Sequence, residues 1–264
     1  MKVSSCIKNK ILEPCSLEGF GYQLDLYTGC EHLCCYCYGL NKAVTKWDEE
    51  VLIHDNLEER LFNELASLEP QVIYIGMNSD PYQQSEAVCD QTSAALELLA
   101  AQGFSASVLT KSGLITRDTG LFKKMPFPAA GISVAFNAES TRKRFEKNAP
   151  PTKERIKALG KMKEAGIKTY TLICPVLPYI TDVEALLELV TPCSDEIWVY
   201  KLEMNAYTDP NWQNLKLVLE QFYPDLSEKF KEIVFSSNHE YWEETRTTLE
   251  KLRPIVAPRL IIEV

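Results

Sequence analysis

Short apolar runs alternate with amphipathic runs along most of this chain, and this alternation restricts its fold more than any other feature. Apolar, β-type runs predict six strands, over residues 22–26, 72–75, 106–109, 131–136, 168–173 and 197–200. Helical spacing, or the capping and stop residues of a helix, predicts helices over residues 57–68, 90–101, 118–124, 152–165, 182–190, 212–222, 227–235 and 239–252. Strands that are each followed by a helix indicate a parallel sheet with helices outside it.

The number of these units predicts an α/β fold with an open, partial (β/α)6 barrel, because six units are too few for a closed eight-fold barrel. We expect an N-terminal segment at residues 1–20, the barrel core at residues 21–205 and a mainly helical C-terminal extension at residues 206–264 that packs on the core. A last strand is expected at residues 259–262. The wide mouth of such a barrel can admit a large substrate, and the chemistry belongs at the C-terminal ends of its strands.

The apolar content fits a cytoplasmic protein with a sizeable core. The chain has 264 residues, of which 45% are hydrophobic, enough for one barrel-sized domain. No run approaches the roughly 20 apolar residues that a membrane span needs. Residues 1–6 also lack the apolar stretch of a secretory signal. We therefore expect a cytoplasmic location and no membrane partner.

The charge balance argues against a general duplex-DNA binder. The formal net charge is −9, whereas such proteins are usually basic because they neutralise phosphates. The charge is uneven: residues 139–168 hold ten Lys or Arg against four Glu, and residues 182–250 hold fifteen Asp or Glu against five Lys or Arg. Two interpretations stay open, namely solvated helical faces or a basic rim that holds an anionic substrate.

Three cysteines in one short loop indicate an iron–sulfur cluster. Cys30, Cys34 and Cys37 form a C-x3-C-x2-C pattern just after the first predicted strand. Three thiolates can ligate three irons of a [4Fe–4S] cluster and leave the fourth iron open for a substrate or cofactor. A zinc site that adds His32, Cys35 or a distant cysteine as the fourth ligand is the alternative.

The chain has nine cysteines, and the remaining six predict no second cluster by their spacing. Most are expected to be small buried hydrophobes, or bystanders in the case of Cys35. Cys6 and Cys15 precede the barrel and are too few to form an auxiliary cluster alone. Cys174 ends a predicted strand at the functional end of the barrel, so a role as a functional thiol stays open.

The loop motif resembles the signature of the radical S-adenosylmethionine (SAM) superfamily. Four blocks are similar to its spore photoproduct lyase-like branch, at residues 27–38, 79–83, 110–112 and 148–155. The resemblance implies that SAM chelates the fourth iron. It also implies that reduction cleaves SAM to methionine and a 5′-deoxyadenosyl radical, which abstracts hydrogen from a substrate.

The resemblance also implies roles for individual residues. Ser79, Lys111 and Ser133 match positions that contact SAM, and Lys111 would pair with its carboxylate. Tyr36 resembles the aromatic residue that lies along the adenine. Tyr38 matches a tyrosine near the radical relay and is the catalytic candidate. Structural roles are the alternatives, such as a surface position for Lys111, turn capping for Ser79, or packing of the loop by the tyrosines.

One departure from the lyase pattern bears on the substrate. Met77 occupies the position of the lyase's hydrogen-donating cysteine, and a thioether has no S–H bond to give. We therefore expect a different substrate, either a small molecule or a modified biopolymer, and not nucleic acid. The reducing partner would be a protein such as flavodoxin or ferredoxin. A DNA-repair lyase is the alternative within the class, and a non-catalytic electron carrier or scaffold is the alternative outside it.

Overall fold

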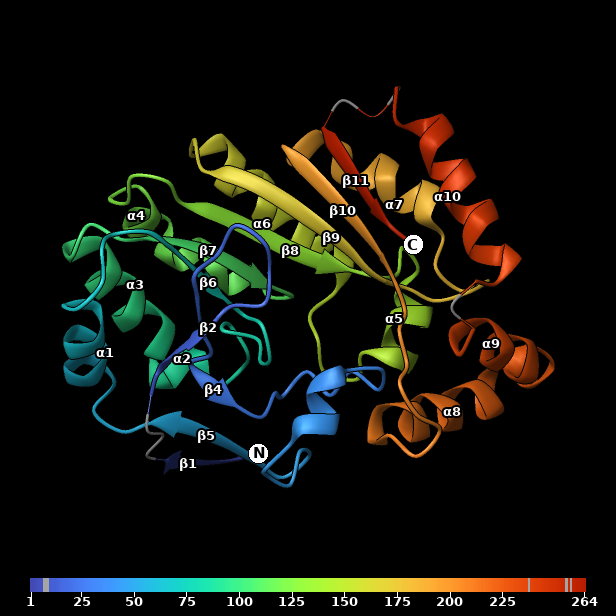
Figure 1. The fold of residues 1–264 in the computed structure, drawn as a ribbon, viewed down its shortest axis with the longest axis horizontal. Coiled ribbons are helices and arrows are strands. Elements are labelled where there is room, and N and C mark those ends of the chain that lie inside the picture. The colour runs from blue at the N-terminus through green and yellow to red at the C-terminus, as the bar shows by residue number, and fades with distance from the viewer. Residues whose placement is uncertain (7–9, 237, 255, 257) are drawn as a thin grey trace.

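An eight-stranded sheet forms the centre of the computed structural model, which describes residues 1–6, 10–236, 238–254, 256 and 258–264 (Figure 1). The strands lie in the order β11-β10-β9-β8-β7-β6-β3-β2. All neighbours pair in parallel except β2, which is antiparallel to β3. The bounds are β2 Leu12–Pro14, β3 Tyr22–Leu24, β6 Val72–Ile75, β7 Ser105–Thr110, β8 Ala129–Val134, β9 Lys168–Val176, β10 Glu196–Lys201 and β11 Arg259–Glu263. Within the described residues the sheet does not close, so the partial-barrel prediction is confirmed.

Helices cover one face of this sheet (Figure 1). They are α1 Leu57–Leu65, α3 Gln91–Ala101, α4 Thr119–Phe122, α6 Thr152–Glu164, α7 Val183–Val190 and α10 Glu240–Leu252. Ile73 and Val108 share one buried apolar cluster with α1 and α3. Ile197 and Val199 share another with α7 and α10. This burial holds the strands in place and is the main stabilising term of such a layered fold.

The other face of the sheet is free of these helices. Successive side chains of a strand point to opposite faces, so the neighbours of buried core residues lie on the free face. Ile132 and Val134 are in the helix-side core, and Ser133 between them therefore lies on the free face. By the same alternation Trp198 and Tyr200 of β10 are on the free face. This free face is where the barrel mouth can receive a ligand.

The first predicted strand is shorter than expected. It spans residues 22–24, and Tyr27–Thr28 form β4, which joins a separate three-stranded sheet with β5 (Glu50–His54) and β1 (Lys2–Cys6). Asp25 redirects the chain between β3 and β4, because its carboxylate accepts hydrogen bonds from Asn78 N at 2.7 Å and Asn78 Nδ2 at 2.6 Å. The sequence did not predict β1, β2 or β5, which are short strands at the edge of the structure.

The C-terminal part is mainly helical but returns to the sheet. It holds α8 Pro210–Phe222, α9 Ser227–Val234 and α10, and then β11 pairs with β10. The last predicted strand is therefore confirmed. Two further short helices, α2 Glu86–Cys89 and α5 Glu139–Phe145, were not predicted. No helix in the described part of the chain is long and apolar enough to cross a membrane.

Candidate active site

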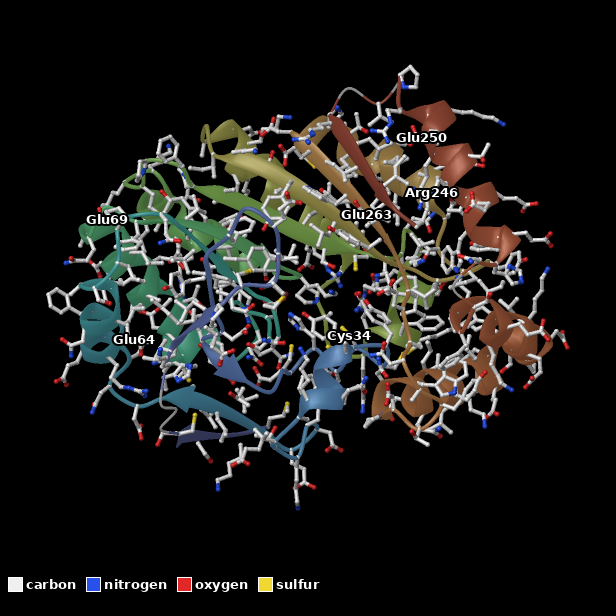
Figure 2. All side chains as sticks on the ribbon, in the orientation of Figure 1. Cys34, Glu64, Glu69, Arg246, Glu250 and Glu263 are labelled. Atoms are coloured by element: carbon white, nitrogen blue, oxygen red, sulfur yellow. The ribbon has the colours of Figure 1, made fainter. Side chains whose placement is uncertain are left out.

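The three cysteines of the motif lie in one loop between β4 and the 3-10 helix Tyr38–Lys42. Figure 2 labels Cys34 in this loop, close to α5. Cys30 and Cys34 are each 8% exposed, and Cys37 is half-buried. Burial, together with the nearby Asp80 and Cys37, raises the pKa of the Cys30 thiol to about 12. Thiols held this way need a bound cation to ionise, and the iron of a cluster would supply that charge.

The chemistry of this donor set fits an iron–sulfur cluster. The Cys30 and Cys37 thiols both interact electrostatically with the Cys34 thiol, and Cys37 also interacts with Cys30. The three thiols therefore lie close to one another. Among the described residues, no group of three or more His, Cys, Asp or Glu side chains converges to hold a single metal ion. In a cluster each thiolate binds a different iron, so the sulfurs do not have to meet at one point.

Lys111 and Ser133 meet at the ends of adjacent strands. Lys111 follows β7, and its Nζ donates a hydrogen bond of 2.9 Å to Ser133 Oγ on β8. Ser133 Oγ in turn donates to the Cys174 carbonyl at 3.3 Å. Burial opposes the charge on Lys111, but Cys34 and Glu146 outweigh it and raise the pKa of the ammonium group. The site therefore presents a half-buried cation near Cys34, as a carboxylate-binding lysine requires.

Ser79 lies against the start of the cysteine loop. Its side chain is 7% exposed, and its Oγ donates to the Tyr27 carbonyl at 2.8 Å. The turn that follows is capped by Asp80, whose Oδ1 accepts from Tyr82 N at 2.8 Å. The turn-capping alternative for Ser79 therefore belongs to Asp80 instead.

Tyr36 is held by a buried ion pair that the sequence did not predict. Its hydroxyl donates to Glu146, which also accepts from the Arg155 guanidinium. Glu146 and Arg155 are both 0% exposed. Burial would raise the pKa of Glu146, but Arg155 and Lys111 hold it below its usual value. Arg155 Nη1 also donates to the Ser133 carbonyl at 2.9 Å. This pair therefore connects the cysteine loop to β8.

A second buried contact joins the cysteine loop to β7. His32 Nε2, between two cysteine ligands in sequence, lies at the ion-pair distance of 3.0 Å from Asp80 Oδ2. Asp80 also accepts from Thr110 Oγ1 at 2.6 Å and from Lys111 N at 2.6 Å. Burial opposes ionisation of Asp80, but His32 and these donors hold its pKa well below the usual range. Asp80 thus holds the backbone of Lys111 in place. The only signal for Asp80 in the sequence was its position in the block of residues 79–83 that resembles the lyase.

Tyr38, Met77 and Cys174 lie at the mouth. Tyr38 is 46% exposed, and its hydroxyl donates to the Met77 carbonyl. Burial raises the pKa of the Cys174 thiol to about 11, while Lys111 opposes that shift. Cys174 also acts electrostatically on Tyr38. A thiol and a phenol therefore lie on the same side of the sheet as Lys111.

An aromatic wall continues the free face beyond Ser133. We use this name for Trp198 and Tyr200 of β10, whose ring centroids are 6.2 Å apart with ring planes only 4° from parallel. Leu172 pairs with Ser133 on one side and with Trp198 on the other, so these three side chains form one row across the sheet. Tyr200 is paired with Glu263 of β11, which is labelled in Figure 2. A flat aromatic surface of this kind suits an apolar or planar ligand group.

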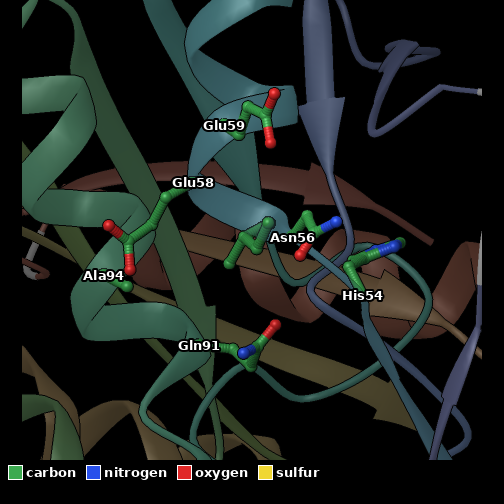
Figure 3. Close-up of a pocket in the computed structure, with 7 residues that line it drawn as sticks. His54, Asn56, Glu58, Glu59, Gln91 and Ala94 are labelled. Carbon is green, nitrogen blue, oxygen red and sulfur yellow. The ribbon is translucent and has the colours of Figure 1, made fainter.

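A pocket on another part of the surface contains none of the predicted site residues. It has a volume of about 370 Å³ and is lined by His54, Asn56, Leu57, Glu58, Glu59, Gln91 and Ala94 (Figure 3). It lies along α1 and α3, whereas the cysteine loop follows β4. A buried three-thiol loop at the C-terminal edge of a parallel sheet is the arrangement of a cluster-dependent enzyme, and we place the active site there.

Known proteins share this sequence and fold. A family model described as the Radical SAM superfamily matches residues 24–190. An uncharacterized protein of Methanocaldococcus jannaschii is 30% identical over 220 residues, which cover 82% of this chain and 82% of that protein. An uncharacterized protein of Mycobacterium tuberculosis is 27% identical over 244 residues, covering 85% of this chain and 70% of that protein.

Solved structures are similar over nearly the whole chain. Spore photoproduct lyase complexed with dinucleoside spore photoproduct has a TM-score of 0.69 and 15% identity, covering 99% of this chain and 82% of that chain. Methylornithine synthase has a TM-score of 0.53 and 12% identity, covering 92% of this chain and 70% of that chain. At these identities the structures show a shared fold.

This chain belongs to the radical SAM superfamily. It is a radical SAM enzyme, and its cofactors are a [4Fe–4S] cluster and SAM. The suspected resemblance is thus confirmed at the level of the family. The assignment of each cofactor to particular residues is a further step.

Proposed function

We propose that Cys30, Cys34 and Cys37 bind the cluster and that Lys111, Ser133, Ser79 and Tyr36 bind SAM beside it. The observation that carries this proposal is the contact of Lys111 with Ser133, because it joins a half-buried cation near Cys34 to a hydroxyl on the neighbouring strand. When bound and reduced, the cluster supplies the electron that cleaves SAM to methionine and a 5′-deoxyadenosyl radical.

The protein's own part in this chemistry is to bind and orient. The Lys111 ammonium pairs with the carboxylate of SAM, as a point charge that replaces solvent. Tyr36 would bind the adenine of SAM, and the Glu146–Arg155 pair holds the tyrosine hydroxyl in place. Asp80 fixes the backbone of Lys111. Such prearranged groups lower the barrier by positioning the reactants and excluding water.

The substrate is proposed to lie on the free face, between Tyr38 and the aromatic wall. A small molecule or a modified biopolymer with an apolar or planar group fits the surface of Trp198 and Tyr200. The solved neighbours bind ligands of both kinds, since one holds a dinucleoside spore photoproduct and another a precursor peptide. Tyr38 is the catalytic candidate because it is exposed at the mouth and contacts Met77.

The second candidate function is DNA repair of the spore photoproduct lyase type. The fold supports it, since spore photoproduct lyase shares it. Two features of this chain oppose it, namely the net charge of −9 and the thioether of Met77. Repair would require another hydrogen donor, and Cys174 is the thiol at the mouth. We expect no efficient conversion of a photoproduct dinucleotide to thymines, and clean conversion would make repair the leading function.

We further propose a cytoplasmic location and a protein reductant such as flavodoxin or ferredoxin. A [4Fe–4S] cluster that must be reduced for each cleavage needs an electron donor that works at low potential. The alternative of a non-catalytic electron carrier would not need Lys111 and Ser133 beside an open iron.

Anaerobic turnover tests the proposal directly. Reconstituted protein with dithionite and SAM should form 5′-deoxyadenosine slowly even without the true substrate. The matched control is the Cys30→Ala variant treated in the same way, which should form none. Wild-type protein that holds a full cluster but yields no 5′-deoxyadenosine would favour the carrier function and contradict ours.

A further inference from the structure

One segment, residues 145–148, separates the cysteine loop from solvent on one side. Cys35 N donates to the Phe145 carbonyl at 2.9 Å, and Cys34 forms an isolated antiparallel bridge with Glu146. Asn148 Nδ2 donates to the Glu31 carbonyl at 3.0 Å. Backbone hydrogen bonds therefore connect a proposed cluster ligand directly to the end of α5. Figures 1 and 2 show α5 beside the loop that carries Cys34.

The outer side of this segment is basic. Lys143, Arg144 and Lys147 are exposed, whereas Glu146 between them is completely buried. The one acidic residue of α5, Glu139, is paired with Arg142 at 2.6 Å. The cationic side chains are therefore not neutralised by their own helix.

An aromatic edge continues this basic surface. The Arg144 guanidinium lies 4.8 Å from the ring centroid of Phe222 and donates a 3.0 Å hydrogen bond to the Tyr223 hydroxyl. Phe222 at the end of α8 is 41% exposed. We name these residues the α5 patch, and its members are Lys143, Arg144, Lys147, Phe222 and Tyr223. Exposed cations around an exposed aromatic ring are typical of protein-binding surfaces.

The α5 patch contrasts with the rest of the molecule. The whole chain carries a net charge of −9, and Glu220 of α8, the acidic residue two positions before Phe222, is paired with Lys216 at 3.4 Å. An acidic protein is repelled by a surface of that overall sign and is attracted locally by the patch. Such a field orients the approaching partner and raises its association rate.

We propose that an acidic one-electron carrier protein docks on the α5 patch and reduces the cluster through the contact between residues 34–35 and residues 145–146. One electron leaves the reduced flavin or iron–sulfur centre of the carrier and enters the cluster, and no bond forms or breaks in this step. The proposal rests on the proposed function, because it takes Cys34 as a cluster ligand. It places the reductant on α5 and α8, whereas the aromatic wall lies on β10.

The test compares two charge-reversal variants of the reconstituted holoenzyme. K143E/K147E changes the α5 patch. K123E/K124E makes the same change in charge at two exposed lysines between α4 and β8, before the N-terminal end of β8, whereas α5 follows the C-terminal end of that strand. A reduced bacterial flavodoxin is the carrier, and cluster bleaching is followed by stopped-flow absorbance at low and high salt. Parallel assays measure 5′-deoxyadenosine with dithionite in place of flavodoxin.

We expect K143E/K147E to slow reduction by flavodoxin on the order of tenfold at low salt, and the difference to shrink at high salt because charge steering is screened. K123E/K124E should reduce at the wild-type rate. Both variants should keep the wild-type rate with dithionite, since a small reductant needs no docking surface.

Three results would overturn the docking proposal. The first is an unchanged flavodoxin rate in K143E/K147E, and the second is an equal loss in K123E/K124E. The third is a parallel loss with dithionite, which would show damage to the cluster site. A wild-type protein that forms no 5′-deoxyadenosine with dithionite would instead contradict the proposed function. If K143E/K147E keeps the flavodoxin rate but loses affinity for a single-stranded oligonucleotide, the patch serves an anionic substrate.

Discussion

The cysteine-loop end of the free face and the aromatic wall differ in how they are built. The loop end is polar and buried, and the Glu146–Arg155 and His32–Asp80 contacts join it to neighbouring strands. The wall consists of two half-buried rings on a strand surface, with Glu263 paired beside it. The first region fixes its side chains in one geometry, as a cofactor common to the whole superfamily requires. The second offers shape and apolar area, which can vary with the substrate.

Removal of a ligand thiol should have the largest effect, because it removes a proposed cluster ligand from the cysteine loop. Cys30→Ala, Cys34→Ala and Cys37→Ala should each lower bound iron from about four per chain to near zero. Cys35→Ala is the control, since this neighbouring thiol is not assigned as a ligand. Iron and sulfide analysis after anaerobic reconstitution measures the outcome. Loss of iron in the Cys35 variant alone would mean that the ligands are wrongly assigned.

Breaking the buried ion pair should be the next largest effect. Arg155→Ala leaves Glu146 without its partner at a completely buried position, which costs about 3–5 kcal/mol of stability in comparable pairs. Urea unfolding of the cluster-free protein measures this loss. Lys157→Ala on the exposed side of the same helix is the control and should change stability by less than about 0.5 kcal/mol. Equal losses of stability in the two variants would mean that the Glu146–Arg155 pair does not stabilise the cysteine-loop end.

Lys111→Ala should weaken SAM binding without loss of the cluster. The lost charge-assisted contact is worth about 1.5–3 kcal/mol, or roughly tenfold to a hundredfold in affinity. Equilibrium binding of SAM to the reconstituted variant tests this, with iron content measured on the same sample. Lys124→Ala, at an exposed position before the N-terminal end of β8, should bind SAM as the wild type does. Unchanged affinity in the Lys111 variant would remove this lysine from the cofactor site.

The smallest effect is expected for a substitution in the aromatic wall. Trp198→Ala removes half of the aromatic wall but none of the groups assigned to SAM. The substrate-independent rate of 5′-deoxyadenosine formation with dithionite should therefore stay within about twofold of the wild type, a change below about 0.5 kcal/mol in the barrier. Ser133→Ala, two strands away in the same row, should lower that rate. A drop in the Trp198 variant as large as in the Ser133 variant would show that the wall belongs to the cofactor site.

Several elements of the fold were predictable because local patterns determine them. Val72–Ile75 was predicted with its observed bounds, and Thr152–Glu164 to within one residue. The first is a continuous β-type apolar run, and Thr152 and Gly166 mark the ends of the second. Strand β1 and strand β5 were missed, since they pair with each other across about fifty residues and β5 pairs with the two-residue strand β4 on its other side. A pairing of that range leaves no period in either segment.

For the site, the amino-acid sequence by itself determined the family and the cysteine motif, because three closely spaced thiols reach one cluster whatever surrounds them. Lys111 and Ser133 were each predicted from a resemblance to contact SAM, and the structure brings the two side chains together. Only the tertiary structure revealed Glu146, Arg155 and Asp80 as the groups that hold this end, and only it placed Trp198 beside Tyr200 on the free face. Charges far apart in sequence stabilise each other only once folding has buried them side by side.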